Sequence, residues 1–281
     1  MDDINNIETS AKKDFVYAAK TQTNITLEQS SAVNPYVAKV NFLHGYNVID
    51  LMEKKSFVEV LLLLFVGELP EPTKVQLFER LMIVLMNLGP RHPAVKAAMV
   101  AGVSKANAEH LLPIGLSVLG GKSNGAKEVE RAVTFLQCNI AKPAAEVANK
   151  LIIAMKDNKL MGEFHLCPGF GNHYGGIDEY TSDVAKQITT DIQSEFSFIN
   201  WASDFSECIA PYHMGWLKTG LAAAVFCELG IGAREAIGLF QLICAPGIFA
   251  HGIEQTHKPI TAIPMLSDEE HVYQLGVDLL S

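Results

Sequence analysis

The chain has 281 residues and a mass of 30.7 kDa, a length that accommodates about two domains of ordinary size. Hydrophobic residues make up 49% of it and charged residues 19%, which excludes a disordered, collagen-like or coiled-coil chain. Asp and Glu outnumber Lys and Arg by 31 to 22, so the net charge of −9 offers no long-range basic field for nucleic acid.

The cysteines and the N-terminal residues bear on cellular location. The five cysteines are widely spaced and form no Cys-x-x-Cys pair, which favours reduced thiols over a disulfide framework. Residues 1–6 are acidic and polar, unlike a secretory signal. The apolar run at residues 60–66 is far shorter than the roughly 20 residues that cross a bilayer. We therefore predict a cytoplasmic protein with no membrane partner.

Helical patterns dominate the chain after its first segment. Residues 24–47 carry hydrophobic residues with poor helical phase, which predicts an extended chain or short strands. Ser56 and Glu59 then form a capping box at a predicted helix start. Five glycines within residues 162–180 predict a long structured loop, a feature that is often functional. The fold class is predicted as all-α, with helices over residues 56–66, 72–88, 94–102, 107–119, 126–138, 144–155, 182–198, 212–229 and 233–255.

Small residues cluster in two of the predicted helices, at residues 220–225 and 245–247. Side chains of this size allow two helices to approach closely. A helix that is apolar on all sides can also lie in a subunit interface. The clusters therefore indicate either a tightly packed core or a surface that binds a second copy of the chain.

Two further motifs have better structural than functional interpretations. Gly121-Lys122-Ser123 resembles the end of a phosphate-binding P-loop, but Leu116 stands where the P-loop needs its first Gly, and a helix precedes it instead of a strand. His165, Cys167 and His173 share the glycine-rich segment and could meet a metal, but no second pair of ligands follows. We predict a turn between helices at the first motif and no metal site at the second.

Three segments, taken in this order, resemble the citrate synthase superfamily and particularly its short citryl-CoA lyase-like branch. The first lies within residues 45–70 and includes Gly-Tyr-Asn-Val-Ile-Asp-Leu and Gly-Glu-Leu-Pro. The second is Pro-Gly-Phe-Gly at residues 168–171. The third is Pro-Gly-Ile-Phe-Ala-His-Gly-Ile-Glu-Gln at residues 246–255. The resemblance extends over about residues 37–255.

The resemblance implies an all-α, citrate synthase-like fold in which a large and a smaller helical domain close over a cleft. The large domain would comprise residues 1–125 and 219–281, and the small domain residues 126–218. The resemblance also implies a homodimer that binds CoA or an acyl-CoA together with an organic acid. The chemistry of the family is Claisen-type addition of an acetyl-CoA enolate to a 2-oxo acid, or its reversal. An acidic side chain and two histidines carry the protons.

The sequence departs from the family pattern at each of these functional positions. Ser123 and Asn172 stand where the two catalytic histidines are expected, and Thr219 replaces the catalytic Asp. Ala245 replaces the Arg that binds the substrate carboxylate, and Leu88 replaces another His. Thr219 cannot accept a proton near pH 7, whereas Ser123 and Asn172 can still donate hydrogen bonds to an oxyanion. Ordinary citrate synthesis is therefore predicted to be close to nil.

The replacing residues and their neighbours form the predicted site. His173 lies one residue beyond the expected His, and Lys218 could bind a carboxylate or form a Schiff base, although a solvated Lys is an equally good interpretation. The candidate catalytic residues are Ser123, Asn172, His173, Lys218 and Thr219. The candidate CoA-binding residues are Lys122, Pro168, Gly169, Phe170 and Gly171. Main-chain N–H groups of the turn at 168–171 are expected to contact the adenine or the phosphates.

Three functional hypotheses follow. The first is a repurposed enzyme that forms or cleaves a carbon–carbon bond in an acyl-CoA or organic acid without citrate synthase activity. The second is a catalytically silent relative that binds a CoA ester or an organic acid, or regulates a partner. The third, a purely structural subunit, ranks below both because such a subunit would not need the glycine-rich loop.

Overall fold

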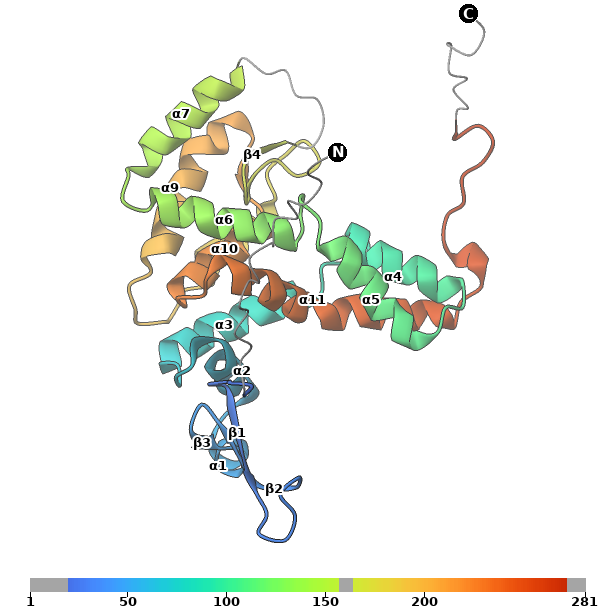
Figure 1. Ribbon diagram of the computed structural model, residues 1–281. Coiled ribbons are helices and arrows are strands. Elements are labelled where there is room, and N and C mark those ends of the chain that lie inside the picture. Colours follow the sequence, from blue (N-terminus) through green and yellow to red (C-terminus); the bar gives the residue numbers. More distant parts are fainter. Residues whose placement is uncertain (1–19, 157–163, 272–281) are drawn as a thin grey trace, which may run out of the picture. The chain divides into compact units, whose positions relative to one another are not determined.

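The computed structural model describes residues 20–156 and 164–271 (Figure 1). The chain divides into two compact units, residues 1–56 and 57–281. The sequence patterns do not predict the boundary at residue 56. The large and small domains with boundaries at 126 and 218 stay a prediction.

The first unit is a small antiparallel sheet followed by a short helix. Its strands β1 (Thr26–Ser30), β2 (Ala38–Leu43) and β3 (Tyr46–Asn47) lie in the order β1-β2-β3. Helix α1 (Val48–Lys54) begins where the Asn47 side chain accepts a hydrogen bond from the Ile49 amide at 2.9 Å. The extended structure predicted for residues 24–47 is confirmed.

The second unit contains ten α-helices among its described residues, and the predicted all-α class is confirmed. Helix α11 packs against α4, α5 and α6, while α10 packs against α6, α9 and α3. Two single-turn 3-10 helices lie at Ala210–Tyr212 and Ile260–Ala262. The α-helices are α2 (Phe57–Val66), α3 (Pro72–Leu85), α4 (Pro93–Val103), α5 (Ala108–Leu119), α6 (Ala126–Asn139), α7 (Ala144–Lys156), α8 (Glu179–Gln187), α9 (Ser197–Ile209), α10 (Lys218–Glu228) and α11 (Ala233–Thr256).

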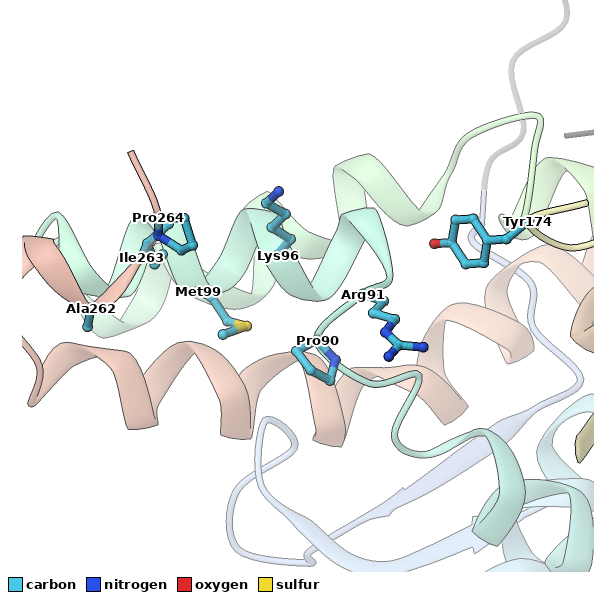
Figure 2. Close-up of a pocket in the computed structure, with 8 residues that line it drawn as sticks. All are labelled: Pro90, Arg91, Lys96, Met99, Tyr174, Ala262, Ile263 and Pro264. Atoms are coloured by element: carbon cyan, nitrogen blue, oxygen red, sulfur yellow. The ribbon is translucent and has the colours of Figure 1, made fainter. Parts of the chain in front are cut away.

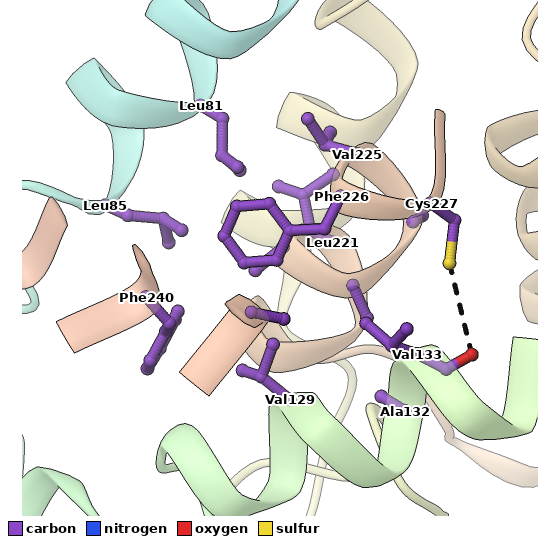
Figure 3. Packing of buried hydrophobic residues seen from close by; sticks show 14 of the residues in the cluster. Leu81, Leu85, Val129, Ala132, Val133, Leu221, Val225, Phe226, Cys227 and Phe240 are labelled. Carbon is purple, nitrogen blue, oxygen red and sulfur yellow. Dashed lines mark hydrogen bonds between the residues drawn. The ribbon is translucent and has the colours of Figure 1, made fainter. Parts of the chain in front are cut away.

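Helix α10 is the centre of the core. Its residues 219–227 are all buried. Figure 3 shows the ring of Phe226 surrounded by side chains from α3, α6 and α11, including Leu81, Val129 and Phe240. Phe226 is fully buried, so its burial stabilises the fold by about 2–3 kcal/mol.

Gly220 of α10 and Gly247 of α11 lie at close approaches, which agrees with the first of the two interpretations of the small-residue clusters, a tightly packed core. The Gly247 amide, next to Pro246 inside α11, donates to the Met86 carbonyl at the end of α3 at 2.8 Å. A Cβ at Gly247 would lie only 2.2 Å from that oxygen. By length and composition α11 could cross a membrane, but one such helix is weak evidence, and α11 packs along three other helices.

Two helix predictions are wrong at their ends. The helix predicted over 182–198 breaks after α8, because the Arg80 guanidinium donates to the carbonyls of Ile188 and Thr190 at 2.9 and 2.5 Å. These contacts satisfy carbonyls that a continuing helix would bond internally. The helix predicted from residue 212 begins only at Lys218, because residues 215–216 pair as a strand with residues 170–171.

Candidate functional site

A tight turn and a short sheet place the glycine-rich segment against α10. Strands β4 (His165–Cys167), β5 (Phe170–Gly171) and β6 (Gly215–Trp216) are antiparallel and lie in the order β4-β5-β6. Gly169 has φ +85°, which suits the third position of a type II turn that has Pro168 before it. A Cβ at Gly169 would lie 2.5 Å from the Gly220 Cα. Glycine at both positions therefore allows the turn to rest directly on the first turn of α10.

A buried carboxylate, Glu128, joins three segments around this turn. Its side chain is 1% exposed and accepts from the Asn124 amide at 2.6 Å and the Gly169 amide at 3.2 Å. Its Oε1 also lies 2.5 Å from His165 Nδ1. Glu128 thus holds the loop before α6, strand β4 and the turn in one arrangement.

A cleft of about 530 Å³ lies beside the first turn of α10. Its walls come from the loop between α3 and α4, the loop before α6, the segment before α8 and the start of α10. The residues that line it are Leu88, Gly89, Pro90, Arg91, His92, Pro93, Asn124, His173, Tyr174, Asp178, Tyr180, Leu217, Lys218, Thr219 and Phe240.

The first two residues of α10 face this cleft with unused hydrogen-bonding groups. Thr219 is 1% exposed, and its Oγ1 is buried without a hydrogen-bond partner within the described residues. The amides of Lys218 and Thr219 have no acceptor inside the helix because they belong to its first turn. The helix dipole adds partial positive charge at the same end. The arrangement can therefore bind an anion.

The ionisable lining of the cleft is mainly basic. Arg91 and Lys218 supply cations, and the Lys218 Nζ lies 5.8 Å from the centre of the Tyr180 ring. Among the described lining residues Asp178 carries the only carboxylate. Its two oxygens accept from the Thr181 amide at 3.0 Å and the Thr181 hydroxyl at 2.6 Å, so Asp178 caps α8. The cleft thus concentrates positive charge within an acidic chain.

His92 links two segments at the edge of the cleft through hydrogen bonds of its neutral imidazole. Its Nδ1 accepts from the Ala94 amide at 3.2 Å, and its Nε2 lies 2.9 Å from the Asn124 carbonyl. This network assigns the proton to Nε2. Burial lowers the pKa of His92, as do the charges of Lys218 and His173, against the opposing effect of the Asn124 carbonyl. His92 therefore ties α4 to the loop before α6 in its uncharged form.

A second cavity, of about 540 Å³, lies beside Pro168 at the start of the 168–171 turn. Its polar walls come from Lys122, Ser123, Glu128, Arg131 and His165, and Phe135 and Leu151 are among its apolar ones. Cys167 also lines it. Burial raises the pKa of the Cys167 thiol well above its usual range, and the nearby Glu128 charge acts in the same direction, so this thiol stays protonated.

The structure separates the candidate catalytic residues. His173, Lys218 and Thr219 line the cleft, whereas Ser123 lines the second cavity. Asn172 instead stabilises the loop through two hydrogen bonds to Phe164. Its side-chain Oδ1 accepts from the Phe164 backbone amide at 3.1 Å, and its backbone amide donates to the Phe164 carbonyl at 2.8 Å. Of the two neighbouring candidates Asn172 and His173, it is His173 that lines the cleft.

The candidate CoA-binding residues are also separated. Lys122 and Pro168 line the second cavity. Gly169, Phe170 and Gly171 are buried, and the Phe170 ring packs 5.0 Å from the rings of Phe205 and Trp216 between centroids. The Gly169 amide already donates to Glu128, which removes one of the main-chain donors expected for a CoA phosphate.

Sequence reasoning missed several residues in and around the candidate site. Arg91 and His92 stand between two prolines at 90 and 93, a loop signal followed by a helix start that could have marked a site. Glu128 gave a weaker signal, a Glu in the first turn of a helix. Within the described ranges, no group of three His, Cys, Asp or Glu residues is arranged to hold a metal ion.

No family model matches the chain, and no curated protein sequence matches it. Solved structures do match. Citryl-CoA lyase from Hydrogenobacter thermophilus is 21% identical with a TM-score of 0.72, over 91% of this chain and 94% of that one. ATP citrate lyase from Methanothrix soehngenii, in complex with citrate and coenzyme A, is 16% identical with a TM-score of 0.68, over 98% of this chain and 47% of that one.

Citrate synthase from Thermoplasma acidophilum, in a ternary complex with carboxymethyl coenzyme A and oxaloacetate, is 18% identical with a TM-score of 0.56. That match covers 78% of this chain and 57% of the other. The chain therefore has the fold of the citrate synthase superfamily. The near-complete mutual coverage with citryl-CoA lyase supports the resemblance to the short branch at the level of the fold.

Proposed function

We propose that this protein binds the organic-acid part of a CoA ester in the cleft at α10 and the CoA part in the second cavity, and that it forms or cleaves a carbon–carbon bond without citrate synthase activity. The observation that carries the proposal is the buried, unpartnered hydroxyl of Thr219 at the first turn of α10.

A carboxylate of the ligand satisfies these groups. One oxygen accepts from the Thr219 hydroxyl and from the amides at the start of α10, and the Lys218 ammonium supplies a counter-charge. The same position would repel a phosphate or carboxylate if it carried an Asp. The replacement by Thr219 therefore converts a proton-accepting position into an anion-binding one.

The second cavity suits a CoA ester. Lys122 and Arg131 offer cations for phosphates, and Phe135 and Leu151 offer apolar surface for the pantetheine arm. Solved relatives with this fold hold coenzyme A or a CoA analogue, which supports CoA as the cofactor. Side chains, rather than the Gly169 amide, are proposed to make the phosphate contacts.

The bond-breaking direction needs one base and one stabilised oxyanion. His173 accepts the proton from the hydroxyl of a 3-hydroxyacyl thioester, and the carbon–carbon bond between that carbinol carbon and the thioester α-carbon breaks. Its electron pair moves to the thioester oxygen as an enolate, which the Arg91 guanidinium in the same cleft stabilises. The proton then returns from His173 to the α-carbon, and an oxo acid and a shortened acyl-CoA leave. Bond formation is the reverse.

A silent binding protein is the second candidate. It is favoured by the hydrogen bonds of Asp178, the single carboxylate among the described residues of the cleft, because both of its oxygens are held by Thr181. Citrate synthesis needs a carboxylate to remove the proton next to the thioester, and Asp178 is not available for it.

Binding and turnover separate the two candidates. Calorimetry with citrate, malonate and CoA tests the two sites, and a coupled assay for oxo acid release from citryl-CoA tests cleavage. Thr219→Val keeps the side-chain shape and removes the hydroxyl, so it should weaken acid binding about tenfold, the equivalent of one charge-assisted hydrogen bond. Thr134→Val on the exposed side of α6 is the control. Unchanged binding in Thr219→Val would contradict the proposal.

We also propose a cytoplasmic homodimer. Five half-exposed apolar side chains lie on the packed helices α4, α5 and α11, namely Val100, Ile114, Val118, Leu242 and Phe249, with exposures between 38% and 47%. A second copy of the chain would cover such a surface. All five cysteines are free, which fits a reducing compartment.

A further inference from the structure

A third cavity adjoins the cleft and has no part in the proposed function. We call it the α4 groove; its volume is about 640 Å³, and it extends along α4 to residues 262–264 (Figure 2). Pro90, Arg91 and Tyr174 line both the groove and the cleft, so the two cavities meet at these residues. A ligand that is longer than the cleft would continue into the groove.

The lining of the α4 groove combines two cations with apolar surface. Arg91 and Lys96 are its charged residues, and none of the described residues that line it is acidic. Figure 2 shows Pro90 and Met99 between α4 and α11, with Arg91 and Lys96 carried at separate points along α4 and the loop before it. An anionic end group and an apolar stem would both find complementary surface there.

Tyr174 stands at the junction of the two cavities in an unfavourable backbone conformation. Tyr174 and Gly175 have φ of +50° and +84°, and the His173 amide donates to the Gly176 carbonyl at 2.7 Å. This is a two-residue hairpin turn of type I′, in which Asn and Gly are preferred at both central positions. A bulky residue at positive φ is uncommon and often marks a functional site.

The Tyr174 ring makes little contact with the protein that would explain its presence. It lies 4.2 Å from the His173 ring between centroids and is 67% exposed. In Figure 2 its hydroxyl points over the groove toward α4. A ligand that passes from the cleft into the groove would contact the ring face.

We propose that the cleft and the α4 groove form one elongated site for an acid with two anionic ends and an apolar middle. One end binds at Lys218 and Thr219, the other at Arg91 and Lys96, and Tyr174 covers the chain between them. The inference rests on the proposed binding of an organic acid in the cleft. It adds that this acid is a dianion whose charges are separated by several methylene groups.

Calorimetry with three acids tests the inference. Suberate carries two carboxylates at the ends of a methylene chain, octanoate has the same chain length with one carboxylate, and succinate has two carboxylates with a short spacer. Suberate should bind at least about tenfold more tightly than either, the value of one additional charge-assisted contact. Lys96→Gln should reduce this advantage and leave octanoate binding unchanged, whereas Arg91→Gln, at a residue that lines both cavities, should weaken the binding of suberate and of octanoate. Lys150→Gln, on the surface of α7 outside both cavities, is the control.

Tyr174→Asn gives a test in which stability and binding move in different directions. Asn suits the turn better than Tyr, so the Tm should stay the same or rise, while suberate binding weakens about tenfold. Equal affinities for the three acids, with binding that still depends on Thr219, would refute the elongated site and leave the proposed function standing. No Thr219-dependent binding of these three acids, of citrate or of malonate would refute both.

Discussion

Replacing Glu128 by Gln should destabilise the protein strongly, although the two side chains have nearly the same shape. The carboxylate of Glu128 accepts from two amides, those of Asn124 and Gly169, and pairs with His165. A Gln side chain has one acceptor oxygen, so at least one buried amide would face its NH2 group and lose its partner. An unsatisfied buried amide costs about 1–3 kcal/mol, and a hydrogen bond to a charged group contributes about 1.5–3 kcal/mol.

The expected loss is therefore about 3 kcal/mol in the free energy of unfolding, which corresponds to a fall in Tm of about 6–12 °C for a chain of this size. Urea denaturation and a thermal scan of the unliganded protein measure it. Glu130→Gln is the matched control, since Glu130 lies two residues away on the same helix and pairs with Lys127 at the surface. The control should lose at most about 0.5 kcal/mol. A loss below that value in Glu128→Gln would refute the role assigned to the carboxylate.

Three further predictions concern pH, turnover and assembly. Because the pKa of His92 is lowered in the folded protein, the unfolded chain takes up this proton at a higher pH as the solution is acidified. The contribution of His92 to stability is therefore complete above about pH 6.5 and is lost as the pH falls below it. The urea midpoint of His92→Asn should decline less with acidity than that of the wild type, and parallel curves would contradict this. Acetyl-CoA and oxaloacetate should release no thiol above background, because thiol release needs hydrolysis of the thioester as well as bond formation, and no residue of the proposed site is assigned to hydrolysis; a rate of even about 1 s⁻¹ would show that the site also hydrolyses the thioester. Light scattering at micromolar concentration should give a dimer, and Leu242→Glu, at a side chain 47% exposed on α11, should give a monomer, whereas a monomeric wild type would disprove the proposed interface.

Local sequence signals predicted those helices whose ends depend on their own residues. Helix α3 begins at Pro72, a residue favoured in the first turn, and α11 extends over 233–256 as its apolar pattern predicts. The break after α8 could not be predicted in this way, because the group that satisfies the Ile188 and Thr190 carbonyls is Arg80, more than a hundred residues earlier in the chain. Helix-forming propensity is outweighed there by a tertiary contact.

The sequence by itself determined the fold class and two of the segments that form the cleft, the one that contains His173 and the one at Lys218 and Thr219. Apolar periodicity, glycines in tight turns and the order of three motifs can all be recognised in the sequence without the structure. It also named His173, Lys218 and Thr219. Only the tertiary structure decided that these three line one cleft while Ser123 lines another cavity and Asn172 holds a loop. The physical reason is that a side chain's role depends on which partners the fold brings to it. The buried carboxylate of Glu128 contacts the amides of Asn124 and Gly169 and the imidazole of His165, which come from three separate segments. No sequence pattern around Glu128 predicts these partners.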